Sequence, residues 1–413
     1  MPAPTWPADL PPFLWGAATS AHQVEGGTDN DWTDWEAAGR VRGQARSGAA
    51  CDHWHRYRED LDLLQAIGLN AYRFSVEWSR VEPEPGRVDP AALDHYREVA
   101  RAARTRGLIP CVTLHHFTLP RWFARRGGFA AAGAGRPFLA QVARTVRALA
   151  PWVPCFVVFN EPLIYVLMGY VRGEWPPGLR QPHRLLTLSR RLARLQQEAY
   201  AVIKAEAPGA LVGVAKHQVH FLPATPRWRD RAAAALAGRL FNDAFLEAVA
   251  DRLDFIGLNY YTRNWVTARH PLTPGFHPPG GPGGPVTDMD WEVDPEGLEV
   301  LLHRLARFRL PIVVTENGIA TTDDGFRTAF LEAHLAALAR AGAAGVPIRG
   351  YFYWAALDNF EWALGFGPRF GLIAVDYATQ ARRVRPSAAV LGAWARAGPP
   401  SAPPPPSPTG DRL

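Results

Sequence analysis

The sequence is poor in cysteine, methionine and lysine. Among its 413 residues there are three cysteines and three methionines, and the only lysines are Lys204 and Lys216. The cysteines, at positions 51, 111 and 155, are odd in number and too scattered for a disulfide framework. We therefore expect free thiols and a reducing compartment, which predicts a cytoplasmic protein.

Signals for export and for membrane insertion are missing as well. The N-terminal segment Met1–Leu10 has neither the basic start nor the apolar core of a signal peptide. No stretch of the chain approaches the ~18 consecutive apolar residues that a membrane-spanning helix requires. We expect neither a targeting segment nor a membrane partner.

Positive charge is in excess, but it is not concentrated. The net charge is +6, and nearly all the cationic side chains are arginines spread along the chain. Nucleic-acid binding needs a basic patch or stripe, so we expect no nucleic-acid partner. His53 and His55 resemble a metal pair only superficially, because no further ligands follow at the required spacing. We expect no metal and no cofactor.

What the sequence does contain is an alternation of short apolar runs and long amphipathic stretches. The runs are rich in β-branched and aromatic residues, recur eight times and alternate with segments of helical periodicity. This alternation predicts parallel strands closed into a single (β/α)8 barrel, an α/β fold. An open doubly wound sheet fits less well, because Thr19–Gln23 after the first run is no glycine-rich phosphate turn. The expected strands are Phe13–Ala18, Ala71–Val76, Ile109–Leu114, Cys155–Phe159, Leu211–Ala215, Asp254–Leu258, Pro311–Thr315 and Gly350–Trp354, and the clearest helices are His55–Ile67, Pro90–Arg106, Phe138–Ala150, Leu185–Ala207 and Phe326–Ala341.

One domain accounts for almost the whole chain. We expect a catalytic domain over residues 1–397 and a proline-rich, disordered tail over residues 398–413. The segment His270–Pro285 is dense in proline and glycine and predicts an extended loop near the mouth of the barrel. Nothing in the sequence marks an interface, so the oligomeric state stays open.

Two glutamates each close a buried strand. Glu161 follows the apolar run of CFVVFNEP at 155–162, and Glu316 follows that of PIVVTENG at 311–318. A carboxylate at this position is costly to desolvate unless it is paired, but barrel enzymes gather their catalytic groups at the C-terminal ends of strands. Two carboxyls facing one pocket are the equipment for cleaving a glycosidic bond. The sequence therefore predicts a glycosidase, and the Asn-Gly pair after Glu316 predicts a turn.

Longer motifs make a resemblance to a known family specific. Residues 159–162 read FNEP, residues 314–318 read VTENG and residues 351–362 read YFYWAALDNFEW. These motifs resemble, in the same order, the signatures of the family 1 glycoside hydrolases, the β-glucosidase family. Four further stretches fit that family and extend the resemblance over nearly the whole ordered chain: FLWGAATS at 13–20 leading to Gln23, YRFSVEWSR at 72–80, GLNYY at 257–261 and RFG at 369–371.

The resemblance implies a retaining hydrolysis of terminal β-D-glucosides in two steps, with β-D-fucosides and β-D-galactosides as secondary substrates. It implies that Glu161 is the acid/base and that Glu316 is the nucleophile. Arg73 and Tyr261 would keep Glu316 ionised and oriented, because a neighbouring guanidinium favours the charged carboxylate. Glu316 would then be the anion at rest, and its charge would keep Glu161 protonated.

The same resemblance implies which residues hold the sugar. Gln23 and Glu361 would bind its hydroxyl groups, and Trp354 would lie under the ring. Of the neighbours His115 and His116, we expect one to be a core histidine with its hydrogen bonds satisfied, and the resemblance favours His116 as the sugar ligand. A carboxylate at Glu361 would repel phosphate, which argues against 6-phosphosugars. The implied substrate-binding residues are Gln23, His116, Asn160, Trp354, Glu361, Trp362 and Phe370, and Asn160, Asn259, Arg73 and Tyr261 are implied as catalytic support.

The chain also departs from the family pattern. Residues 116–120 read HFTLP where the family usually has His-Trp-Asp-Leu-Pro, which changes one wall of the sugar site. The part of the pocket that holds the leaving group would be open and apolar, lined by Trp122, Phe123 or Leu163. Such a pocket could favour transfer of the sugar to an acceptor over hydrolysis. A catalytically silent sugar-binding barrel is the third alternative, and the complete set of implied catalytic residues argues against it.

Overall fold

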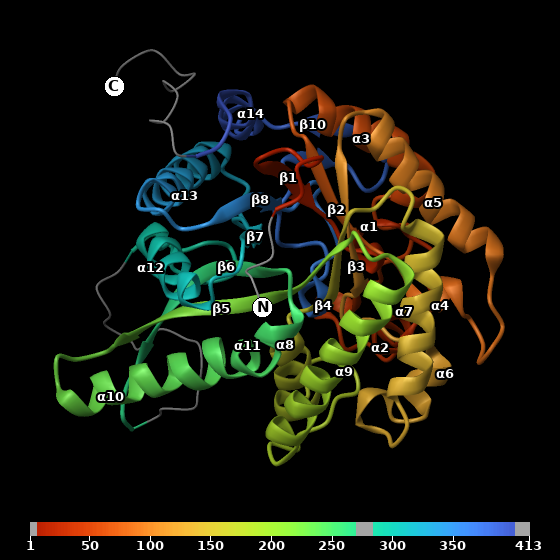
Figure 1. The fold of residues 1–413 in the computed structure, drawn as a ribbon, viewed down its shortest axis with the longest axis horizontal. Coiled ribbons are helices and arrows are strands. Elements are labelled where there is room, and N and C mark those ends of the chain that lie inside the picture. The colour runs from red at the N-terminus through yellow and green to blue at the C-terminus, as the bar shows by residue number, and fades with distance from the viewer. Residues whose placement is uncertain (1–5, 270–283, 401–413) are drawn as a thin grey trace.

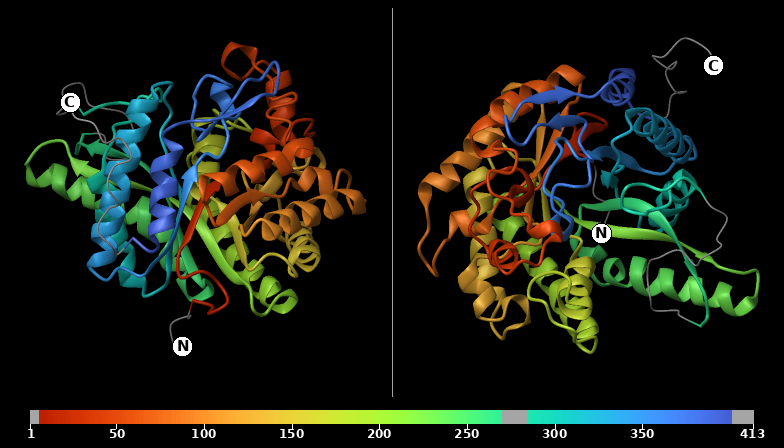
Figure 2. Two further views of the ribbon diagram at one scale, coloured as in Figure 1. Left: turned by 90° about the horizontal axis from the view of Figure 1, so that it is seen from above. Right: turned by 180° about the vertical axis from the view of Figure 1, so that it is seen from behind.

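The chain folds into a closed barrel of parallel strands surrounded by helices (Figure 1). The structure, a computed structural model, describes residues 6–269 and 284–400. Within this part of the chain the barrel order is β1-β2-β3-β4-β5-β6-β7-β8, and β8 closes onto β1. The predicted (β/α)8 barrel is confirmed. Views from above and behind show the helices on the outside of the barrel (Figure 2).

Each of the expected strands is present. The barrel strands are β1 (Leu14–Ala18), β2 (Ala71–Ser75), β3 (Ile109–His115), β4 (Cys155–Asn160), β5 (Leu211–Pro223), β6 (Phe255–Val266), β7 (Ile312–Asn317) and β8 (Ile348–Trp354), and a separate antiparallel pair is formed by β9 (Ile373–Val375) and β10 (Arg382–Val384).

The helices follow the predicted alternation and add short elements in the loops. The α-helices are α1 (Ala21–Val24), α2 (Asp31–Ala37), α3 (His53–Ile67), α4 (Trp78–Val81), α5 (Pro90–Thr105), α6 (Arg121–Arg125), α7 (Gly135–Leu149), α8 (Pro162–Val166), α9 (Arg184–Glu206), α10 (Trp228–Ala237), α11 (Ala244–Val249), α12 (Pro295–Leu305), α13 (Asp324–Ala343) and α14 (Ala388–Ala397). Short 3-10 or π turns are η1 (Arg42–Gln44), η2 (Gly128–Ala130), η3 (Leu167–Arg172), η4 (Gly238–Asp243), η5 (Ala250–Arg252), η6 (Ala306–Phe308) and η7 (Trp362–Leu364).

Local sequence explains where several helices begin and end. Helix α5 begins where Asp89 accepts a hydrogen bond from Ala91 N, with proline at its first position. In α13 the side chain of Asp323 accepts from two backbone N–H groups of the first turn. Helix α3 ends at Gly68, whose φ of 99° is the left-handed conformation that glycine adopts without a steric penalty.

Alternate residues of each strand face two separate cores. In β4, Cys155 and Val157 belong to the cluster inside the barrel, whereas Phe156 and Val158 belong to the cluster between barrel and helices. Both sets are fully or almost fully buried, which is why these strands read as continuous apolar runs in the sequence. All three cysteines are buried free thiols, and Sγ of Cys111 lies 3.0 Å from Sγ of Cys155 inside the barrel.

Strands β5 and β6 are longer than the sequence predicted. The prediction ended them at Ala215 and Leu258, but they continue as a parallel pair to Pro223 and Val266. Figure 1 shows β5 and α10 extending to one side of the barrel. The extension places polar side chains of β5, beginning at Lys216, next to the C-terminal ends of the neighbouring strands.

Two predicted segments fall largely outside the described residues. They are most of the loop predicted at His270–Pro285 and most of the tail predicted from Gly398. Of the tail, Gly398 is described, and its carbonyl accepts a hydrogen bond from Trp15 Nε1 at 2.9 Å. Among the helices of the described ranges, none combines the length and apolarity that crossing a membrane would take.

Candidate active site

The two glutamates lie at the C-terminal ends of two strands that β5 and β6 separate in the barrel. Glu161 follows β4 directly, and Glu316 is the penultimate residue of β7. Both are buried, with 8% and 3% of their surface exposed. The backbone of Glu161 has φ 44° and ψ 58°, a left-handed conformation that is uncommon outside glycine and that concentrates at functional sites.

Glu316 is held by a cation and a phenol. Arg73, in β2, donates from Nη1 to Oε1 of Glu316 at 2.5 Å, and its side chain is completely buried. Tyr261, in β6, donates its hydroxyl to Oε2 at 2.7 Å. Arg73 is fixed in turn by Thr113 Oγ1 at 3.1 Å and by the carbonyl of Thr315 at 3.1 Å. Both carboxylate oxygens therefore have a donor, and the carboxylate has one orientation.

Glu161 is joined to the same network through two asparagines. Asn259, in β6, donates from Nδ2 to Oε1 of Glu161 at 2.8 Å and to Oδ1 of Asn160 at 3.1 Å. Oδ1 of Asn160 also accepts from Nη2 of Arg73 at 2.7 Å. The side chains of Arg73, Asn160 and Asn259 thus connect the two glutamates by direct hydrogen bonds. Thr315 Oγ1 fixes Asn259 by donating to its Oδ1 at 2.6 Å.

The charge of the two carboxyls depends on a histidine that the sequence did not predict. Burial raises the pKa of Glu316 to about 7. The guanidinium of Arg73 acts to lower this pKa, and the negative charge of Glu161 acts to raise it further. Burial also acts to raise the pKa of Glu161, but the nearby His217, a hydrogen bond from Asn259 and the charge of Lys216 together outweigh it and lower that pKa. Burial thus acts on both carboxyls in the same direction, and Arg73 opposes it at Glu316 as His217 opposes it at Glu161.

The predicted sugar-binding residues gather around these glutamates. His116 lies beside Asn160, whose amide nitrogen is 3.1 Å from Nε2 of the imidazole. The His116 ring stacks on Trp354 with ring centres 5.7 Å apart and on Trp362 at 6.0 Å. Burial lowers the pKa of His116 well below its usual value, so the ring is neutral and can exchange hydrogen bonds with hydroxyl groups.

A second group of the predicted residues includes Gln23 and Glu361, and Glu361 precedes the Trp362 that stacks on His116. Gln23, in α1, donates from Nε2 to Oε2 of Glu361 at 3.1 Å and to Oδ1 of Asn359 at 2.9 Å. Burial raises the pKa of Glu361 to about 8, the charge of Glu316 adds to the rise, and the Gln23 hydrogen bond opposes it. Phe370 lies near Tyr261, with ring centres 6.2 Å apart. All the predicted site residues therefore belong to one cluster.

Three expectations need correction. Phe123 is buried beneath Trp78 and Phe129, so it cannot line a side for the leaving group. Asn317 is the last residue of β7 rather than part of a free turn, and Gly318 is required because a Cβ there would lie 1.7 Å from the Trp354 carbonyl oxygen.

The third concerns the histidine pair. His115 packs edge-on between Phe129, Phe159 and Tyr165, and neither of its ring nitrogens has a hydrogen-bond partner among the described residues. It is a core histidine as expected, but its hydrogen bonds are not satisfied. Burial lowers its pKa to about 3, which keeps it neutral.

The sequence prediction missed residues of β5. His217 Nδ1 lies 3.3 Å from Oε1 of Glu161, and Lys216 precedes it with no exposed surface. The signal was available, because polar residues at the end of a buried strand had already singled out Glu161. It was overlooked because the predicted strand stopped at Ala215. Asn359 was also missed, although it lies within the quoted motif 351–362.

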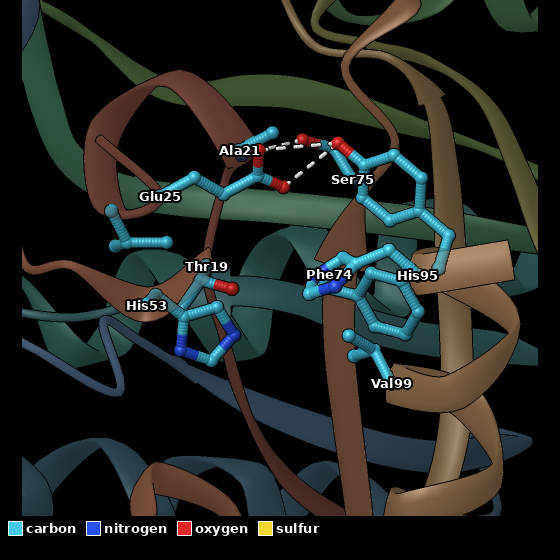
Figure 3. A pocket seen from close by; sticks show the side chains of 10 residues that line it. Thr19, Ala21, Glu25, His53, Phe74, Ser75, His95 and Val99 are labelled. Atoms are coloured by element: carbon cyan, nitrogen blue, oxygen red, sulfur yellow. Dashed lines mark hydrogen bonds between the residues drawn. The ribbon is translucent and has the colours of Figure 1, made fainter. Parts of the chain in front are cut away.

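A small cavity lined by both apolar and polar side chains lies behind β1 and β2, outside the barrel (Figure 3). Its volume of about 10 Å³ can hold no more than one water molecule, so it is no sugar site. Tyr72 OH lies 2.6 Å from Thr19 Oγ1 and 3.0 Å from Nε2 of His53, which also contacts Asp60 at 2.7 Å. Since Tyr72 precedes Arg73, this cluster fixes the strand that carries the arginine.

Metal ligation finds no support in the part of the chain that is described. There, no group of three or more histidine, cysteine, aspartate or glutamate side chains could hold a metal ion. His53 and His55 point to different carboxylates, Asp60 at 2.7 Å and Asp52 at 2.6 Å. The site consists of two carboxyls with their donors.

A parallel barrel with two buried carboxyls at the ends of strands four and seven defines a glycosidase-type active site. The model of glycosyl hydrolase family 1 matches residues 5–252 and 239–396. The chain belongs to glycosyl hydrolase family 1, whose members are retaining β-glycosidases.

Relatives and solved structures agree with this assignment over nearly the full length. The chain is 30% identical to β-glucosidase A of Thermotoga maritima, over 91% of this chain and 95% of the relative. It is 34% identical to the thermostable β-glucosidase B of Thermobispora bispora, over 91% and 88%. The solved β-glycosidase of Pyrococcus horikoshii superposes with a TM-score of 0.87 at 39% identity, covering 95% of each chain.

Proposed function

We propose that this chain removes terminal, non-reducing β-D-glucosyl residues from small O-glycosides, with β-D-fucosides and β-D-galactosides as secondary substrates. The observation that carries the proposal is the unbroken run of hydrogen bonds from Glu316 through Arg73, Asn160 and Asn259 to Glu161. Further support comes from the relatives named β-glucosidase and from a solved T. maritima β-glucosidase in complex with glucoimidazole, 28% identical with a TM-score of 0.86.

In the first step the Glu316 carboxylate attacks the anomeric carbon and forms an ester bond to the sugar. Glu161 gives its proton to the glycosidic oxygen, so the leaving group departs as a neutral alcohol. Arg73 and Tyr261 hold the two oxygens of Glu316 and align the attacking one. The reactive protonation state has the negative charge on Glu316 and the proton on Glu161.

In the second step the roles of Glu161 reverse. Its carboxylate takes a proton from a water molecule, which attacks the anomeric carbon and breaks the ester bond to Glu316. Glu316 is released as an anion, and Glu161 is protonated again. Two inversions at the anomeric carbon give net retention, and the cycle consumes one water molecule and no cofactor.

Sugar selection falls to the residues around the glutamates. Burial raises the pKa of Glu361 to about 8, so at neutral pH it can donate as well as accept a hydrogen bond. It then lacks the full negative charge on which the expected repulsion of phosphate depended. Gln23 is oriented by Ser20, which donates to its Oε1 at 2.6 Å. The indole of Trp354 supplies an apolar face for the ring carbons. Asn160, His116, Trp362 and Phe370 complete the proposed sugar-binding set.

The cytoplasm is the proposed location. Three buried free thiols, two of them with sulfur atoms 3.0 Å apart, suit a reducing compartment. An independent check is the thiol content of the protein isolated from its native cells under denaturing, alkylating conditions. Three alkylated cysteines per chain are expected, and a disulfide between Cys111 and Cys155 would contradict the location.

The proposed reaction is tested with p-nitrophenyl β-D-glucoside, β-D-galactoside and β-D-fucoside. Wild type is expected to cleave the glucoside, with the β anomer of glucose as first product by NMR. Glu316→Gln, which keeps the shape of the side chain but cannot attack, is expected to lose activity by ~10⁴-fold or more. Wild-type protein that cleaves none of the three substrates would overturn the proposal.

A further inference from the structure

His217 occupies a position that the proposed reaction has not yet used. It is in register with Asn259 of β6, which is itself in register with Glu316 of β7. Ala215, two residues earlier in β5, belongs to the cluster inside the barrel, so His217 projects to the same side. The N–H of Glu161 donates to the carbonyl of Ala215 at 2.8 Å, which ties the acid/base to this strand.

The imidazole is aimed at the carboxyl of the acid/base. Nδ1 of His217 lies 3.3 Å from Oε1 of Glu161, the same oxygen that accepts from Asn259. Nδ1 is buried and makes no well-aligned hydrogen bond to any described residue. Hydrogen bonds of catalytic groups are often long in the free enzyme and tighten when substrate binds.

Aromatic rings fix the imidazole in this position. It stacks on Tyr261 with ring centres 6.1 Å apart and an angle of 22°, and it meets Phe241 edge-on at 6.0 Å. Its side chain is only 14% exposed. The ring thus lies close to both the acid/base and the tyrosine that holds the nucleophile, and its neighbours leave it little freedom to turn away.

The charges around His217 leave Glu161 as its natural counter-ion. On its own strand Lys216 is buried, and burial lowers the pKa of that ammonium to about 7 against the charges of Glu161 and Asp243. Tyr261 stays a neutral phenol, because burial and the charge of Glu316 raise its pKa. Asp243, in η4, is paired with Arg304 and Arg307. Arg73 neutralises Glu316, on the far side of Tyr261.

We propose that His217 is a positioning residue for the acid/base, a proposal that rests on the proposed function. Its imidazolium stabilises Glu161 as a carboxylate between the two proton transfers. In this way it sets the upper pH limit of the reaction. In the first step the proton passes from Glu161 to the leaving oxygen, and the N–H on Nδ1 stabilises the carboxylate that remains. In the second step Glu161 takes a proton from water. Neither transfer uses a proton of His217, so the protons balance between Glu161, the leaving oxygen and water.

The direction of the effect follows from electrostatics. A cation beside a carboxyl favours the ionised form, so Glu161 loses its proton at a lower pH with His217 than without it. Activity on the basic side needs protonated Glu161. Removing the imidazolium is therefore expected to move the basic limb of the pH profile of kcat/KM upward. At lower pH, where Glu161 is still protonated, removing the imidazolium makes Glu161 a weaker acid.

The test compares His217→Asn with wild type on two classes of β-glucoside. The asparagine amide can place a donor near the position of Nδ1 but cannot carry a charge. The basic limb is expected to move up by about one pH unit. On the acid side of the profile, hydrolysis of an alkyl β-glucoside, which needs proton donation, is expected to fall ~10-fold. Hydrolysis of a 2,4-dinitrophenyl β-glucoside, whose leaving group needs little proton donation, should be almost unaffected.

His220→Asn is the matched control, since it makes the same change three residues along β5. His220 contacts Asp294 at 2.8 Å, away from both glutamates. Its variant is expected to keep the wild-type pH profile and the wild-type ratio between the two substrate classes. His217→Gln replaces His217→Asn if the latter does not fold, as judged by circular dichroism.

Either of two results would overturn the proposal for His217. One is a basic limb in the His217 variant that coincides with that of wild type. The other is an equal loss on both classes of substrate, which a purely structural role would give. Wild-type hydrolysis and the inactivity of Glu316→Gln test the proposed function separately, so the two proposals can fail independently.

Discussion

Arg73 donates one guanidinium N–H to Oε1 of Glu316 at 2.5 Å and another to Oδ1 of Asn160 at 2.7 Å. One rigid, planar group thereby fixes the proposed nucleophile and the residue that precedes the proposed acid/base. The strands involved are β2, β4 and β7, which are far apart in the chain. A lysine could supply the charge but not the two fixed directions.

Replacement of Arg73 by methionine is expected to reduce kcat/KM for aryl β-glucosides by about 10²–10³-fold. Arg73 lowers the pKa of Glu316, so without it Glu316 stays protonated to a higher pH. The acidic limb of the pH profile should therefore move up. Arg73→Lys is the control, since it keeps the positive charge. Its acidic limb is expected to lie close to that of wild type, while its rate stays close to that of Arg73→Met. An unchanged acidic limb in Arg73→Met would contradict the assigned role.

Glu361→Gln is expected to stabilise the protein as the pH rises. The pKa of Glu361 is about 8 in the folded protein and 4.5 ordinarily, so between these pH values the unfolded chain loses the proton while the folded protein keeps it. Wild type therefore loses stability progressively as the pH rises through this range, whereas the uncharged glutamine variant does not. The Tm of Glu361→Gln should exceed that of wild type by about 2 °C or more at the upper end of this window and less at the lower end. Scanning calorimetry at both ends measures the difference.

The same variant is expected to change sugar preference. If Glu361 binds a hydroxyl group, the ratio of kcat/KM for the β-glucoside and the β-galactoside should change by about tenfold or more. Glu98→Gln, an exposed acid on α5, is the control for both measurements and should change neither the ratio nor the high-pH Tm. A ratio that stays at the wild-type value in Glu361→Gln would remove this residue from the sugar site.

Arg327→Met is expected to unfold the loops that support the site. The Arg327 side chain has no exposed surface and donates to the carbonyls of Ile319, Thr321, Arg369 and Phe370. Methionine fills similar space but leaves these buried acceptors without donors, at a cost of about 3 kcal/mol or more in the free energy of unfolding. Urea denaturation measures the loss.

The control for this change lies on the same helix. Arg340, in α13, pairs with Glu299 at the surface, and an exposed pair contributes about 1 kcal/mol or less. Arg340→Met should therefore unfold close to wild type. Equal losses in the two variants would mean that the buried hydrogen bonds of Arg327 add nothing.

Gly318→Ala is expected to lower the free energy of unfolding by more than about 3 kcal/mol and to displace Trp354. The new methyl group would lie 1.7 Å from the Trp354 carbonyl oxygen. Nothing lies within 4 Å of a Cβ built at Gly209, so Gly209→Ala should change stability by about 1 kcal/mol or less. Thermal unfolding compares the two, and a Gly318→Ala protein as stable as wild type would contradict the contact.

The barrel was predictable from the sequence because its signal is local. A strand buried on both faces must be apolar at nearly every position, as in Cys155–Phe159, whatever lies next to it. The carboxylates at the ends of such runs, Glu161 and Glu316, stand out for the same reason. Strand ends were less predictable: the three polar residues that follow Ala215 and the mixed sequence after them do not show that β5 continues past the barrel.

The sequence by itself determined the order of the strands, the two glutamates at their ends and the motifs shared with glycosyl hydrolase family 1. Only the tertiary structure decided that His217 faces Glu161 and that Arg73 reaches both Glu316 and Asn160. The physical reason is that these contacts depend on the register between strands, which closure of the barrel sets and no local pattern encodes.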